Sequence, residues 1–187
     1  MLRALIPSVG LAAALSLACQ EEHGGQPATA QLQPLGDSGV GGTVEFTPLT
    51  GTKIRINAEV TGLVPGSHGI HIHEFGDCSD PKGLSAGEHF NPEGVAHGGP
   101  TSATHHVGDL GNITADAGGR GVLTIETDEV TLDRGPRGIL GRSVVVHSGA
   151  DDFMTQPSGG SGDRIACGVI RARRGQTEPV LPGEDTQ

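Results

Sequence analysis

Alternation of apolar and polar residues is the feature that most constrains the fold of this chain. In "KIRINAEV", residues 53–60, every second residue is apolar: Ile54, Ile56, Ala58 and Val60. A period of two is typical of a β-strand with one buried and one solvated face. Similar runs, separated by Gly- and Pro-rich turns, occur at residues 42–49, 121–132 and 141–148. No helical stripe exceeds two turns, so we expect an all-β sandwich or barrel of about eight short strands.

Length and charge narrow the function classes. The chain has 187 residues, enough for one domain with a proper core. Its formal charge of −10 excludes nucleic acid and anionic membrane surfaces as partners on bulk charge. An anionic substrate would need a local positive group to overcome this background.

The first residues have the composition of an export signal. "MLRALIPSVGLAAALSLAC" holds one Arg and an apolar run, and small residues precede Cys19. We expect a signal peptide at 1–18, with Cys19 lipidated as in bacterial lipoproteins; the alternative is ordinary cleavage that leaves a free thiol. Cleavage would remove Arg3, the one charged side chain there, and change the formal charge from −10 to −11.

Polar segments flank the expected domain. Residues 19–30 lack periodicity and are expected to form a flexible tether, in which His23 is solvated. Residues 175–187 contain two prolines and are expected to be a disordered tail. The folded domain is then predicted over 31–174.

Cys78 and Cys167 are the two cysteines left if Cys19 carries lipid. Export places them in an oxidising compartment, so we expect a disulfide; the alternative is a free buried pair. Closing the 89-residue loop between them would destabilise the unfolded chain by roughly 4–5 kcal/mol.

Several histidines occur in one alternating stretch and in the irregular segment that follows it. In "HGIHIHEFGDCS", residues 68–79, His71 and His73 share one face of a strand while Ile70 and Ile72 face the core. Imidazole nitrogens are good ligands for copper and zinc, so an H-x-H strand can place two donors on one ion. Alone, this motif is weak, since many such pairs are simply solvated.

Further donors follow. The Gly-rich segment 77–108 has no alternation and is long for a structureless loop, so we expect something to hold it. The donors in and after it are His89, His97, His106, Asp109 and His147. Together these residues suffice for two sites. His68 has the opposite strand parity and is not expected to join them, and His105 is expected to be exposed.

These motifs resemble the copper–zinc superoxide dismutase family, in its bacterial exported form. The matching stretches are "GIHIHEFGDCS", "AGEHFNP", "HGGP", "HVGDLGN", "GRSVVVHSGADD" and "GGSGDRIACGVI". They occur in the family's order and cover residues 30 to about 171. The resemblance implies a Greek-key β-barrel with two long metal-site loops.

The resemblance also implies site residues. The copper ligands would be His71, His73, His89 and His147. The zinc ligands would be His89, His97, His106 and Asp109, so that His89 is shared. Asp151 would hydrogen-bond His71 and His97 and fix their orientation.

The implied activity is disproportionation of superoxide by a redox-cycling copper. The shared His89 would deliver a proton to the reduced product, and Arg164 would attract and orient the anion. Arg164 lies only 17 positions after His147, with no Lys between them and Asp163 beside the arginine. Within this segment, electrostatic attraction of the anion would therefore rest on Arg164 alone.

Partners and location follow from the same resemblance. We expect an exported protein of the bacterial cell envelope, in the periplasm or lipid-anchored to the outer membrane, with no other membrane contact. Any homodimer should differ from the eukaryotic type, because Arg171, Arg173 and Arg174 occupy the end of the last strand.

Two alternatives remain open. A copper-carrying module, like the dismutase-like domain of copper chaperones, would be expected to lack a copper ligand or Arg164, and a copper-only relative would lack zinc ligands. Every one of these positions is filled here.

Overall fold

The computed structural model describes residues 25–173. The expected signal peptide, Cys19, His23, Arg174 and the tail at 175–187 lie outside the described residues. In the described part, no helix has the length and apolarity that a membrane crossing requires.

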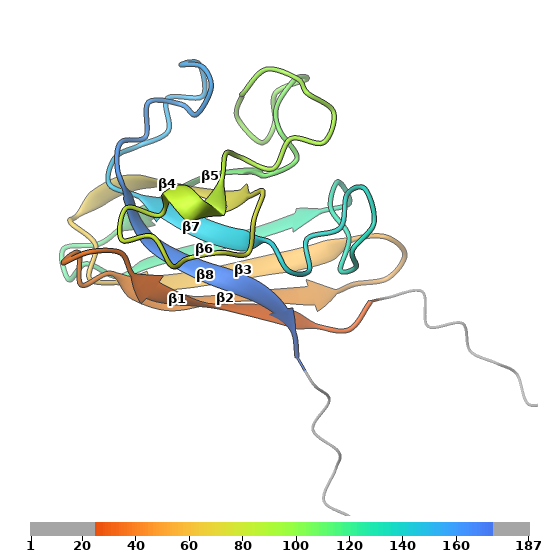
Figure 1. Ribbon diagram of the computed structural model, residues 1–187, viewed down its shortest axis with the longest axis horizontal. Helices are drawn as coiled ribbons and strands as arrows, with labels where there is room; N and C mark the ends of the chain where they lie inside the picture. The colour runs from red at the N-terminus through yellow and green to blue at the C-terminus, as the bar shows by residue number, and fades with distance from the viewer. Residues whose placement is uncertain (1–24, 174–187) are drawn as a thin grey trace, which may run out of the picture.

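Eight antiparallel strands form a closed barrel (Figure 1), which confirms the all-β prediction. Their order around the barrel is β1-β2-β3-β6-β5-β4-β7-β8. Because β7 lies beside β4 rather than beside β6, strands β4 to β7 make a Greek key. The strands are β1 (Ala28–Pro34), β2 (Gly41–Pro48), β3 (Ile54–Thr61), β4 (Gly66–His73), β5 (Asp109–Ala115), β6 (Gly121–Thr127), β7 (Ser143–His147) and β8 (Arg164–Ala172).

Alternating apolar side chains fill the barrel. Phe46 of β2, Ile56 of β3 and Ile70 of β4 are all almost fully buried. The core therefore consists of the inward row that the period-two pattern predicts.

Two long connections carry the expected site. The first loop (residues 74–108) joins β4 to β5 and contains a short 3₁₀ helix, η1 (Leu84–Ala86). The second loop (residues 148–163) joins β7 to β8. Parts of both loops, green and blue in Figure 1, rise from the same side of the barrel. Residues far apart in sequence can therefore meet there.

Two predicted boundaries were wrong. The tether was predicted over 19–30, but residues 28–30 belong to β1, where Ala28 and Ala30 are buried. Short alanines in "PATA" gave no strand signal, and only pairing with β2 and β8 defines them as strand. The run at 121–132 ends as a strand at Thr127, because the Thr127 hydroxyl accepts a hydrogen bond from the Glu129 amide and turns the chain.

Candidate metal centre

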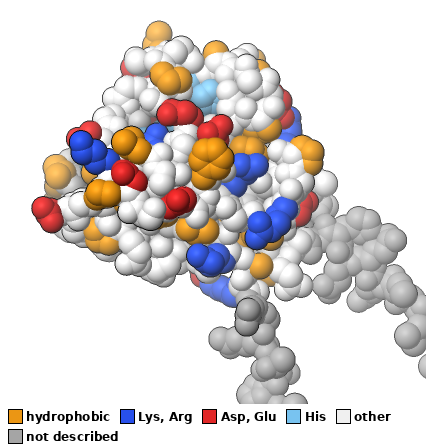
Figure 2. Space-filling model, viewed as in Figure 1, with side chains coloured by type: hydrophobic (Ala, Val, Ile, Leu, Met, Phe, Trp, Pro, Cys, Tyr) orange, Lys and Arg blue, Asp and Glu red, His pale blue; other side chains and the backbone are white. Residues whose placement is uncertain are grey.

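Strand β4 presents two imidazoles on one face. His71 and His73 point away from the core, while Ile70 and Ile72 point into it, and all four side chains are fully buried. The prediction of a shared face is confirmed. The outward row is nevertheless not solvated, because the two loops cover it. Only a small area of histidine surface is visible in the view of Figure 2, in a hollow beside acidic side chains.

Two groups of donor atoms result, and within each group all four atoms lie within 4.8 Å of one another. The first group is His71, His73, His89 and His147. The second group is His89, His97, His106 and Asp109. His89 belongs to both groups, as the resemblance implied, and every member is buried.

Six ring nitrogens in these groups are buried and have no hydrogen-bond partner among residues 25–173. They are His71 Nδ1, His73 Nε2, His89 Nε2, His97 Nδ1, His106 Nδ1 and His147 Nε2. An unpaired buried polar atom is costly, and six gathered in two groups have a common explanation in bound cations. Four imidazoles suit copper, and three imidazoles with one carboxylate suit zinc. The donor sets therefore fit both metals.

Backbone and carboxylate partners fix which nitrogen each ring leaves free. His73 Nδ1 lies 3.0 Å from the Gly87 carbonyl oxygen, which leaves Nε2 facing the first group. His89 Nδ1 lies 2.8 Å from Asp109 Oδ1, so its two nitrogens face different groups. The shared role of His89 is thus visible in the orientation of its ring.

The Asp109 carboxylate lies close to all three histidines of the second group. Its Oδ2 accepts a hydrogen bond of 2.8 Å from the His106 amide and lies 3.0 Å from His97 Nδ1, without hydrogen-bond geometry to that ring. Burial raises the pKa of Asp109, but hydrogen bonds from His106 and His89 outweigh it and hold the pKa well below the usual range. Asp109 is therefore an anion at neutral pH, the form that binds a cation.

Burial favours the neutral form of three imidazoles of the first group by lowering their pKa. It lowers the pKa of His71 to about 4, although the bond to Asp151 acts in the opposite direction. It also lowers the pKa of His73 and of His147 well below 6.5, and neighbouring imidazoles and the Arg164 guanidinium add to this effect. Neutral imidazole is the form that coordinates metal ions.

Asp151 connects the two groups from the second loop. Its Oδ2 lies 2.8 Å from His71 Nε2, and its Oδ1 lies 2.9 Å from His97 Nε2. These are the two contacts that the resemblance implied. Asn112 of β5 holds the Asp151 main chain through both groups of its amide, at 2.8 and 2.9 Å.

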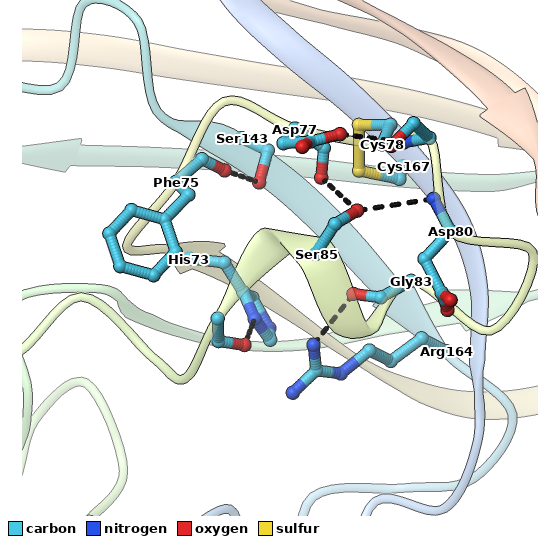
Figure 3. Close-up of a disulfide and its surroundings, with 12 residues drawn as sticks. His73, Phe75, Asp77, Cys78, Asp80, Gly83, Ser85, Ser143, Arg164 and Cys167 are labelled. Atoms are coloured by element: carbon cyan, nitrogen blue, oxygen red, sulfur yellow. Dashed lines mark hydrogen bonds between the residues drawn. A yellow bond between two sulfur atoms is a disulfide. The ribbon is translucent and has the colours of Figure 1, made fainter.

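A disulfide joins Cys78 of the first loop to Cys167 of β8, with 5.7 Å between the Cα atoms. The predicted pairing is confirmed. Figure 3 shows the disulfide on one side of the turn that ends at Gly83. The Arg164 guanidinium lies on the other side of this turn, which is also the side of His73. The disulfide thus ties the first loop to the strand that carries Arg164.

Arg164 is held at the rim of the first donor group. It donates a 2.7 Å hydrogen bond to the Gly83 carbonyl oxygen, and its Nη2 lies 3.8 Å from Glu88 Oε1. It borders an open cavity of about 510 Å³, which Lys82 and Asp163 also line. None of the donor-group residues lines this cavity, but the Arg164 charge acts on the first donor group directly and helps to lower the pKa of His73 and His147.

Several residues were missed or misjudged at the sequence level. Glu88 directly precedes the ligand His89, and that position was the only signal for its contact with Arg164. His105 was expected to be exposed, but its side chain is only 10% exposed, because it bonds to the Ser102 carbonyl oxygen and to Glu129. His68 joins neither group, as expected, and instead bonds to the main chain of His147 and Val64.

Known proteins share these features. A family model described as "Copper/zinc superoxide dismutase" matches residues 40–170. An extracellular Cu-Zn superoxide dismutase of Onchocerca volvulus is 42% identical over 158 residues, which is 79% of this chain and 77% of that protein. Superoxide dismutase [Cu-Zn] 4 of Dictyostelium discoideum is 44% identical over 137 residues, or 70% of this chain and 90% of that protein.

Two further comparisons extend the similarity. A copper chaperone for superoxide dismutase from Sus scrofa is 42% identical over 148 residues, 75% of this chain, and the chain spans only 52% of that chaperone. The crystal structure of the clock protein EA4 superposes with a TM-score of 0.72 at 39% identity, covering 80% of this chain and 96% of that one.

Proposed function

Because the chain belongs to the copper/zinc superoxide dismutase family, we propose that it disproportionates superoxide: two superoxide anions and two protons give molecular oxygen and hydrogen peroxide. The observation that carries this proposal is the pair of donor groups that share His89. Copper would be held by His71, His73, His89 and His147. Zinc would be held by His89, His97, His106 and Asp109.

Bound copper would supply the alternating electron acceptor and donor, whereas zinc has no accessible redox chemistry. The protein's own contribution concerns protons and placement. His89 Nε2 has no hydrogen-bond partner in residues 25–173, and its Nδ1 is fixed by Asp109, so Nε2 is placed to carry a proton to the reduced product. Asp151 fixes the orientation of the His71 and His97 rings, so that the free nitrogen of each ring points toward its donor group.

Arg164 would orient the anion. A guanidinium is always charged and offers several N–H donors in one plane, which suits a small anionic oxygen species. Gly83 occupies Nη1, so the other N–H groups remain for the substrate. The effect of the Arg164 charge on His73 and His147, two members of the copper group, supports this role.

A copper-chaperone role is the alternative, and the intact ligand set together with Arg164 argues against it. The test is to purify the full chain, determine its copper and zinc contents, and follow superoxide decay by stopped flow. We expect one copper and one zinc per chain, rapid decay, loss of activity on chelation and recovery with copper. A fully loaded protein that does not accelerate decay would contradict the dismutase proposal.

We further propose that the protein is exported to a bacterial cell envelope and anchored through a lipid on Cys19. The disulfide supports export. The apolar run before Cys19 supports lipidation, and Gln20 in place of Asp favours the outer membrane. Cys19→Ser should release active enzyme into the soluble fraction, and membrane retention of this variant would exclude the anchor.

Any homodimer should not use the eukaryotic-type surface. Arg171 and Arg173 are exposed at the end of β8, and Arg173 pairs with Glu45, so this end of the strand is charged. Charged residues are depleted at the centres of stable interfaces. Analytical ultracentrifugation of wild type and of Arg171→Glu should give the same state. Dissociation of the variant would place an interface there.

A further inference from the structure

The second loop holds the zinc ligand His97 at a second point besides Asp151. The Gln156 side-chain amide pairs with both main-chain groups of His97. The His97 N–H donates to Gln156 Oε1 at 2.8 Å, and Gln156 Nε2 donates to the His97 carbonyl oxygen at 2.9 Å. The Gln156 side chain therefore forms the two hydrogen bonds with the His97 main chain that a neighbouring β-strand would otherwise form, although the two residues are 59 positions apart.

His97 needs such support because its segment belongs to no helix or strand. Within residues 25–173, the Gln156 amide is the partner found for both main-chain groups of His97. The ring is held separately, by Asp151 Oδ1 at 2.9 Å. Ring and main chain are thus fixed by two residues of the same loop.

The loop is shaped to make both contacts at once. The amide of Phe153 donates to Asp151 Oδ1, and the amide of Asp152 donates to the Gly159 carbonyl oxygen, so the segment curls back over Asp151. Gly159 has φ +70°, and a Cβ there would lie 2.8 Å from His97 Nε2. Only glycine permits this approach, which brings Gln156 over the His97 main chain.

We propose that Gln156 is a positioning residue of the zinc site, which slows zinc release by fixing the main chain of His97. This inference rests on the proposed zinc site. Gln156 does not belong to either donor group and acts only through His97. Without the Gln156 amide, the His97 main chain would lose both of its own hydrogen bonds. The contact of the ring with Asp151 and the 3.3 Å hydrogen bond from the Gly98 amide to Asp109 would remain, and the ligand would leave the ion more often.

The expected effect is on zinc more than on copper, because His97 belongs to the zinc group alone. Loss of a partner that orients a metal ligand lowers metal affinity about 10–100-fold. Since Gln156 acts through the main chain, we expect the lower end: zinc release about 10-fold faster, with copper release changed less than about 2-fold.

The experiment uses the full chain loaded with copper and zinc. Zinc release into a chromogenic chelator is timed for wild type, Gln156→Met, Gln156→Glu and Met154→Ala. Gln156→Met keeps the volume and removes both polar atoms. Gln156→Glu keeps an acceptor for the His97 N–H but cannot donate to its carbonyl oxygen. Met154 lies on the same loop and is 80% exposed, so Met154→Ala is the matched control.

We expect faster release from both Gln156 variants, with Gln156→Met the faster, and wild-type release from Met154→Ala. The visible spectrum of Co²⁺ in the zinc site should change in Gln156→Met, which a general loss of stability would not cause. Release from Gln156→Met within 2-fold of wild type, or equal acceleration by Met154→Ala, would overturn the inference. A wild type that binds no zinc would overturn the proposed function itself. A wild type that holds zinc but lacks dismutase activity would leave the Gln156 comparison valid.

Discussion

The two halves of the barrel bury their strands in different ways. In the open half (β1, β2, β3 and β6), the more buried residues alternate with more exposed ones: β3 alternates buried with partly or fully exposed residues, and β6 alternates partly buried with exposed residues after Gly121. In the covered half (β4, β5, β7 and β8), the last six residues of β4 and all of β7 are buried on both faces. The inward rows of both halves form one core, so the difference lies in what covers the outward rows.

Outward side chains of the open half pair with each other in solvent. Arg55 on β3 contacts Glu126 on β6 at 2.7 Å, and the Thr124 hydroxyl donates to Asn57 at 2.9 Å. Outward side chains of the covered half instead meet the two loops and, together with three histidines of the first loop, form the donor groups. The same strand alternation therefore produces a solvated ladder on one side and a metal centre on the other, and loop coverage is what distinguishes them.

The sharpest test of this contrast removes one donor from the loops over the covered half and one outward side chain from the open half. His89→Ala deletes a donor from both groups, and we expect superoxide decay to fall to the rate of the metal-free protein. Thr124→Ala in the open half should keep wild-type activity. Stopped-flow decay and metal content would be measured together. Residual activity within 10-fold of wild type in His89→Ala would break the assignment of the covered half.

Stability of the covered half should depend on its disulfide. The Cys78→Ser, Cys167→Ser double variant opens a loop whose ends are 89 residues apart. We expect the free energy of unfolding to fall by about 4–5 kcal/mol on the loop-entropy relation. Urea unfolding of oxidised wild type and the double variant would measure it. A loss below about 1 kcal/mol would show that the loops are held without the covalent link.

Acid should weaken the covered half of the metal-free protein before the open half, whose strands contain no histidine. Burial lowers the pKa of His71 to about 4, against about 6.5 when unfolded. The unfolded state therefore binds more protons between these values, and stability falls as pH falls from 6.5 to 4. Because of this histidine alone, the free energy of unfolding should fall by about 3 kcal/mol over this pH range. Urea unfolding across this range, with NMR titration of the His71 ring, would measure it. A ring pKa near 6.5 would contradict the burial argument.

The charged side chains around Arg164 should set the rate of superoxide decay. Arg164→Ala should slow superoxide decay on the order of 10-fold at low salt, and the difference should shrink as salt rises. Neutralising nearby carboxylates should accelerate decay by a smaller factor. Glu88→Gln should exceed Asp163→Asn, because Glu88 lies 3.8 Å from the guanidinium, whereas Asp163 makes no ion pair with Arg164 in residues 25–173. Equal rates for wild type and Arg164→Ala across a salt series would exclude steering.

The smallest effect is expected in the open half. Arg55 and Glu126 pair at 2.7 Å, but both side chains are more than two-fifths exposed. Arg55→Ala should lower the free energy of unfolding by roughly 0–1 kcal/mol and leave superoxide decay unchanged. Thermal unfolding and stopped-flow decay would check both. A large loss of activity would mean that the two halves are coupled.

Local pattern predicted most strands and all the metal-ligand candidates. The alternation at 53–60 corresponds to β3, and the H-x-H motif in β4 has both rings on one face. The same pattern failed at residues 28–30 and beyond Thr127. There, pairing with distant strands or a single side-chain hydrogen bond decides the conformation. Residues such as Glu88 and Gln156 gave no local signal, because their partners lie 76 and 59 positions away.

Two features of the metal centre can be read from the amino-acid chain: which side chains can bind copper or zinc, and which face of a strand each one occupies. Both follow from covalent chemistry and from the two-residue period of a strand. Three other features appear only in the folded protein: which outward rows are covered, which nitrogen each ring leaves free, and the two contacts by which Asp151 and Gln156 hold His97. Those features depend on contacts between residues that only the closed barrel and its loops bring together.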